Sequence, residues 1–105
     1  MSQLARAMTE QQLLDAIVQA AKLHGWMVAH FRPALTAKGW RTPMQGDPGF
    51  PDLVLARKGE VLFLELKSQK GRMTEAQTAW HYELGIARAH LVLPEDLDDV
   101  LCMLR

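Results

Sequence analysis

The stretch GFPDLVLARKGEVLFLELKSQKGRMTEAQTAWHYELG, residues 49–85, contains two apolar runs that are typical of buried strands, at 53–56 and 61–66. The four residues between the runs include Gly59, which suits a tight hairpin turn. We therefore predict a two-stranded hairpin. Its open end carries three ionisable side chains where a strand bound for a core would not: Asp52, Glu65 and Lys67.

Upstream of this hairpin, the pattern predicts a helix, a strand and a loop. Thr9 and Gln12 fit a capping box, and apolar residues at helical spacing continue to about residue 23, before a stop at Gly25. Residues 26–31 have the composition of a short strand. Residues 32–51 contain four prolines and three glycines with little periodicity, so we expect a loop that is long enough to bind something.

Downstream, a second capping box marks the start of another helix. Thr74 and Gln77 form this box, Trp80 and Leu84 are expected on the buried side of the helix, and Gly85 suits its C-terminal cap. A fourth strand is predicted at residues 89–93, and a last helix begins at residue 94, where early acidic residues suit the helix dipole. The apolar side chains of this last helix serve either an interface or the core; they are Val100, Leu101 and Leu104.

The resulting order is α-β-β-β-α-β-α, which predicts an α/β fold in one domain spanning residues 1–105. The single Cys102 excludes an internal disulfide and a cysteine-based zinc site. No apolar segment approaches the roughly 20 residues needed to cross a bilayer, and the N-terminus lacks the pattern of a secretory signal. We therefore expect a cytoplasmic protein with no membrane partner.

The formal net charge is zero, but the charges are unevenly distributed. Residues 16–46 include no acidic residue, and acids collect near the C-terminus. Such asymmetry is compatible with one positive face that binds a polyanion, or with scattered solvated charges. The basic residues of interest form two groups: Lys22, Arg32, Lys38 and Arg41, and then Lys67, Lys70 and Arg72.

The three ionisable groups at the mouth of the hairpin indicate a chemistry. Glu65 and Lys67 are two apart and share a face of their strand, and Asp52 precedes the neighbouring strand at the same end. Adjacent carboxylates repel each other unless a proton or cation lies between them, and Mg²⁺ or Mn²⁺ prefers such oxygen ligands. With an ammonium nearby, the set suits metal-assisted phosphodiester hydrolysis. The alternative is a surface ion pair, worth about 0–1 kcal/mol.

Glu10 is a further acidic candidate. It lies on the same helical stripe as Leu14 and Ile17, so we expect its carboxylate to reach a site, because burying it unpaired is costly. The alternative is a first-turn glutamate that the helix dipole favours.

Taken together, Gly49-Phe50-Pro51-Asp52, Glu65-Leu66-Lys67 and the segment GRMTEAQ with Gln77 resemble the VRR-NUC family of the PD-(D/E)xK nuclease superfamily. The likeness spans nearly the whole chain. It implies a restriction-endonuclease-like core with the order α-β-β-β-α-β, here followed by a C-terminal helix, and a mixed four-stranded sheet flanked by helices. It also implies an Mg²⁺- or Mn²⁺-dependent DNA endonuclease of the small stand-alone phage and bacterial type, a homodimer that cuts branched DNA such as Holliday junctions in repair and recombination.

The resemblance also implies roles for individual residues. Asp52 and Glu65 correspond to the principal metal ligands, together with the backbone carbonyl of Leu66. Glu10 corresponds to an accessory acid that acts on the metal through a water molecule. The two remaining positions complete the catalytic set, namely the catalytic lysine, Lys67, and a glutamine of the following helix, Gln77.

Residues expected to contact DNA flank this set. The predicted loop leads directly into the first acidic residue, so its basic residues are candidates for the DNA backbone near the scissile phosphate. Trp40 suits either stacking on an unpaired base or anchoring of the loop, and His30 is a minor candidate for a phosphate contact. The full set of expected DNA contacts is Arg32, Lys38, Trp40, Arg41, Lys70 and Arg72.

Two other readings stay open. One is a nuclease for flap, nicked or single-stranded DNA. The other is a DNA-binding module that retains the fold without cleaving, against which the presence of Asp52, Glu65 and Lys67 argues.

Overall fold

The computed structural model describes residues 8–31, 34–41 and 44–105, except the side chains at 34, 36 and 41. At its centre is a mixed sheet in which neighbouring strands follow the order β1 (Met27–His30), β4 (Leu53–Arg57), β5 (Glu60–Leu66) and β6 (Ala89–Val92). The first three strands are mutually antiparallel, and β6 runs parallel to β5. The predicted α/β chain with a mixed four-stranded sheet is confirmed.

The turn between β4 and β5 sets the register that builds the site. Arg57 pairs with Glu60, and the two residues between them, Lys58 and Gly59, have φ of 50° and 84°. Positive φ at both central positions matches the right-handed twist of the strands. From this turn, the pairing runs without interruption to Leu53 opposite Leu64.

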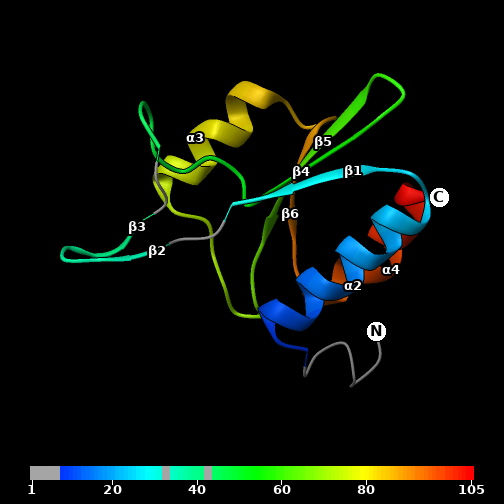
Figure 1. Ribbon diagram of the computed structural model, residues 1–105, viewed down its shortest axis with the longest axis horizontal. Coiled ribbons are helices and arrows are strands. Elements are labelled where there is room, and N and C mark those ends of the chain that lie inside the picture. Colours follow the sequence, from blue (N-terminus) through cyan, green and yellow to red (C-terminus); the bar gives the residue numbers. More distant parts are fainter. Residues whose placement is uncertain (1–7, 32–33, 42–43) are drawn as a thin grey trace.

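One face of the sheet packs against α2 (Glu10–Leu23) and α4 (Leu97–Leu104), which lie side by side (Figure 1). The capping box at Thr9 is present as predicted. Val100 and Leu104 of α4 are buried in the same core as Leu13 and Ile17 of α2. The apolar face of the last helix therefore closes the core, after a short 3₁₀ turn, η1 (Pro94–Asp96).

On the opposite side of the sheet lies α3 (Glu75–Leu84), which begins at the predicted capping box and ends at Gly85 with φ of 94° (Figure 1). Trp80 and Leu84 lie on the more buried side of α3 as predicted, although both are half-buried and no residue of the helix is fully buried. Trp80 packs edge-on against Phe50, with ring centroids 4.9 Å apart. The helix thus rests on the loop before β4.

The prediction of an irregular loop over residues 32–51 is wrong in part. A short hairpin forms within it, with β2 (Ala34–Thr36) paired to β3 (Gly39–Arg41). It projects from one end of the molecule, away from the four-stranded sheet (Figure 1). Strands of three residues are below the length at which alternation is recognisable, which is why the pattern did not show them. In the described part of the chain, no helix is long and apolar enough to cross a membrane.

Candidate active site

Asp52 and Glu65 meet at the open end of the β4–β5 hairpin. The register that pairs Leu53 with Leu64 places them beside each other one step further along, close enough for Asp52 to raise the pKa of Glu65. Asp52 also accepts a hydrogen bond from the backbone N–H of Leu66, with 3.3 Å between nitrogen and oxygen. The structure thus brings together the two carboxylates that the sequence placed at this end.

Glu65 is the most unusual ionisable group in the described residues, because its side chain is only 1% exposed. Burial, followed by the adjacent carboxyl group of Asp52 and its negative charge, raises the pKa of Glu65 to about 8, although the positive charge of Lys67 lowers it. Its Oε1 atom is buried and has no hydrogen-bond partner in the described part of the chain. Near neutral pH, the pair therefore carries a shared proton unless a cation replaces it.

Two further side chains contact the Oε2 atom of Glu65. The Lys67 ammonium lies 3.6 Å from it, and the Gln77 side-chain amide donates a hydrogen bond to it at 3.1 Å. The carbonyl oxygen of the same Gln77 amide accepts from the backbone N–H of Thr74 in the capping box. The capping box therefore orients the Gln77 amide so that its NH₂ group faces Glu65. Gln77 therefore closes the capping box and also contacts the acidic pair.

A cleft of about 350 Å³ opens beside this pair. Asp52 and Leu66 line it from the sheet, and Glu10 lines it from the first turn of α2. Glu10 is exposed at the end of the helix, on the stripe of Leu14, and both residues line this cleft. Its carboxylate therefore faces the same cleft as Asp52, and its role there stays a prediction.

Two of the expected metal ligands, Asp52 and Glu65, have the carboxylate oxygens that a divalent cation prefers. Asp52 and Glu65 lie next to each other, and the Oε1 of Glu65, unpartnered among the described residues, lacks the contact that a cation would supply. Among the residues that the structure describes, no three His, Cys, Asp or Glu side chains lie close enough to hold a metal together. The expected role of Glu10, acting through water, is consistent with this spacing.

The residues expected to grip DNA are placed as follows. Lys38, Lys70 and Arg72 are exposed, and Trp40 is 67% exposed on β3. The backbone of Arg41 lies in β3 but its side chain is outside the described residues, as is the whole of Arg32. None of these described side chains lines the cleft.

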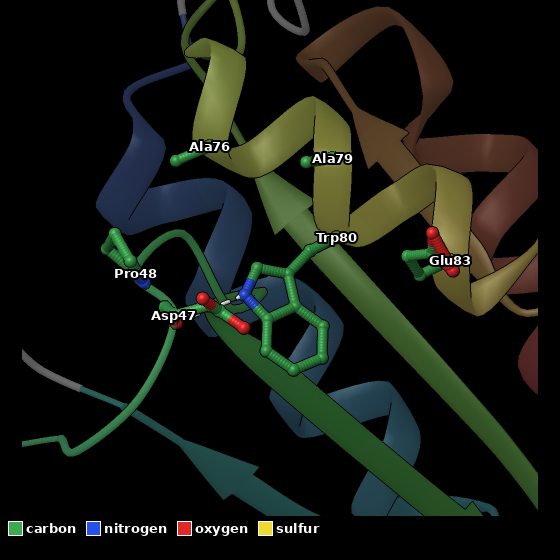
Figure 2. A pocket seen from close by; sticks show the side chains of 6 residues that line it. All are labelled: Asp47, Pro48, Ala76, Ala79, Trp80 and Glu83. Carbon is green, nitrogen blue, oxygen red and sulfur yellow. Dashed lines mark hydrogen bonds between the residues drawn. The ribbon is translucent and has the colours of Figure 1, made fainter.

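A second hollow, of about 290 Å³, lies on the outer side of α3. Figure 2 shows Trp80 reaching from the helix toward the loop before β4, where its indole N–H donates to the backbone carbonyl of Asp47 at 3.2 Å. The hollow is separate from the acidic pair. Its lining consists of Asp47, Pro48, Ala76, Ala79, Trp80 and Glu83.

Two glycines allow close contacts around the site. Gly49 has φ of 96°, and a Cβ there would lie 2.5 Å from the backbone carbon of Ala76, so the loop before Asp52 packs directly on the first turn of α3. A Cβ on Gly71 would lie 2.7 Å from the Cβ of Lys67. Both glycines belong to the motifs that carry the resemblance, but the sequence did not show these contacts.

The cleft is also lined by His30, the last residue of β1, and by Phe31, which follows it. Their place depends on the pairing of β1 with β4, which the sequence pattern could not specify.

No protein-family model, curated protein or solved structure matches this chain. Chemically, the arrangement offers a carboxylate pair that can exchange a proton for a cation, an ammonium beside it and an open cleft for a substrate.

Proposed function

We propose that the chain is a divalent-metal-dependent nuclease that hydrolyses phosphodiester bonds in DNA. One observation carries this proposal: Asp52 lies beside the buried Glu65 at the mouth of a hairpin, with Lys67 next to them and one buried oxygen of Glu65 unpartnered among the described residues. Element order and the mixed sheet support the finer proposal of a restriction-endonuclease-like core in the VRR-NUC family.

Asp52 and Glu65 would hold Mg²⁺ or Mn²⁺, which when bound supplies Lewis acidity toward a phosphate oxygen and lowers the pKa of a water. The Lys67 ammonium, 3.6 Å from Glu65, places positive charge beside the negative charge that develops on the phosphate. Gln77 fixes the orientation of the Glu65 carboxylate through its 3.1 Å hydrogen bond. Glu10 accepts a hydrogen bond from a water in the cleft that it lines.

The proposed substrate is branched DNA of the four-way junction type, cut by a homodimer in the cytoplasm of a bacterium or phage-infected cell. Two protomers suit a junction, because two symmetric cuts are needed and each chain offers one acidic pair. The basic residues along 32–41, which precede Asp52, support a polyanionic substrate.

The test is a panel of labelled linear duplex, flap and four-way junction DNA incubated with Mg²⁺, Mn²⁺ or EDTA. Cleavage that requires metal and favours the junction is expected. Lys67→Ala should abolish cutting while binding persists. Its matched control is Lys58→Asn, which removes an exposed lysine at the far end of the same hairpin and suits the positive φ there. Binding with no metal-dependent product from any substrate would favour the non-cleaving module instead.

A further inference from the structure

The β2–β3 hairpin carries two large apolar side chains that nothing in the described residues covers. Leu35 is 69% exposed and Trp40 is 67% exposed, and the two residues are direct cross-strand partners. Directly paired residues of an antiparallel hairpin project from the same face. They therefore form one apolar patch, named here the Leu35–Trp40 patch, and Trp40 does not anchor the hairpin to the core.

This patch is not explained by folding. An isolated two-stranded hairpin is marginal in water, and an exposed indole adds no buried area to stabilise it. Elsewhere in the chain, a tryptophan of structural use is buried, as Trp26 is at 3% exposure. The exposed patch therefore indicates an external partner.

The charge around the patch indicates which partner. Residues 16–46 contain no acidic side chain, and the hairpin with its flanks carries Arg32, Lys38 and Arg41. An exposed indole in a basic, acid-free segment of the sequence suits an unpaired nucleic-acid strand, whose bases stack on the ring and whose phosphates attract the cations. A second copy of this chain would bring the same positive segment against itself, which the charge disfavours.

Position connects the patch with the cleft. Phe31, which lines the cleft, is followed by β2 after two residues, so Leu35 lies at most about 14 Å from Phe31. A strand seated on the patch is thus near enough to pass into the cleft beside Asp52. The hairpin stands outside the sheet, where a branched substrate has room to separate its strands (Figure 1).

We infer that the β2–β3 hairpin selects DNA with unpaired bases, through stacking of Trp40, assisted by Leu35, on a base next to the cleft. The inference rests on the proposed function and names the feature of the substrate that its site recognises. It assigns to Trp40 a role in specificity, separate from the metal chemistry of the acidic pair.

The experiment measures binding in EDTA, where no cutting occurs, to a blunt duplex and to the same duplex with a single-stranded arm. Trp40→Ala should weaken binding to the armed duplex about tenfold and change binding to the blunt duplex little. Trp40→Phe should restore most of the loss, because a ring remains. Leu23→Ala is the control, since it removes a side chain that is 78% exposed at the C-terminal end of α2, outside the β2–β3 hairpin.

Equal losses on both duplexes, no loss on either, or no binding at all would each overturn the inference. So would a Trp40→Ala protein that changes from dimer to monomer yet keeps its preference for the single-stranded arm, since the patch would then be a contact between copies. Cleavage with Mn²⁺ is scored separately. If the protein binds the armed duplex as expected but does not cut DNA, the inference about Trp40 is supported and the proposed nuclease activity is rejected. If the protein cuts DNA equally well with and without Trp40, the nuclease activity is supported and the inference is rejected.

Discussion

Raising the pH should destabilise the metal-free protein through Glu65. Its pKa in the folded chain lies at about 8, mainly because burial penalises the charged form and secondarily because of Asp52. In the unfolded chain, the carboxyl titrates near its ordinary value of 4.5. Between these two values, the folded state retains a proton that the unfolded state has lost. The contribution of Glu65 to stability is therefore fully present below about pH 4.5 and is lost as the pH rises through 8.

The magnitude follows from the same pair of values. Each pKa unit corresponds to about 1.4 kcal/mol, so a rise in the pKa of Glu65 from 4.5 to about 8 corresponds to a loss of folding stability on the order of 5 kcal/mol at high pH. This is an upper figure, because relaxation and water entry soften the penalty of a buried charge. Even half of it is a large share of the roughly 5–15 kcal/mol by which a domain is stable.

The assay is urea unfolding in EDTA from pH 5 to pH 9, for the wild type and for Glu65→Gln. The amide is uncharged at every pH, so we expect similar stability of the two proteins at pH 5 and a growing advantage of Glu65→Gln toward pH 9. His81, whose pKa burial and the charge of His90 lower, contributes in the opposite direction, but equally in both proteins. Parallel curves for the two proteins would refute the reasoning, and Mn²⁺ should restore the wild type at high pH.

Three further predictions concern the supports of the site. Gly49→Ala should destabilise the fold by about 2–4 kcal/mol, measured by urea unfolding, because its Cβ would overlap the backbone of Ala76 at positive φ. Gly71→Ala should slow cleavage and also lower the melting temperature, because its Cβ would lie 2.7 Å from the Cβ of Lys67 and force the chain there to shift; a normal cleavage rate would show that the lysine tolerates the shift. Arg57→Ala should cost about 1–3 kcal/mol and leave Mn²⁺ binding intact, because its guanidinium donates to three backbone carbonyls far from the acidic pair.

Much of the fold was predictable because its signals are local. The two capping boxes and the turn at Gly59 each depend on a few adjacent residues, and the structure contains all three. The juxtaposition of Asp52 and Glu65 followed from this turn, since a two-residue turn sets the register along the whole hairpin. Local sequence signals were therefore sufficient to predict that the two acidic residues lie next to each other.

The remaining features depend on contacts between distant segments. The place of β1 next to β4 brings His30 and Phe31 to the cleft, and no pattern within 26–31 specifies that neighbour. The close approach of Gly49 to α3 is likewise a tertiary contact. For Glu10, helical spacing indicated the face that it shares with Leu14, but it did not show that the core ends before this residue, which is exposed and lines the cleft.

The central claim is that Asp52 and Glu65 bind one divalent cation in place of a shared proton. Calorimetric titration of Mn²⁺ at pH 7, in buffers of different ionisation enthalpy, tests it most directly. The wild type should bind Mn²⁺ with release of about one proton per ion, because the pKa of Glu65 lies at about 8 before binding. Asp52→Asn should bind far more weakly. Binding without proton release, or equal binding by Asp52→Asn, would contradict the account.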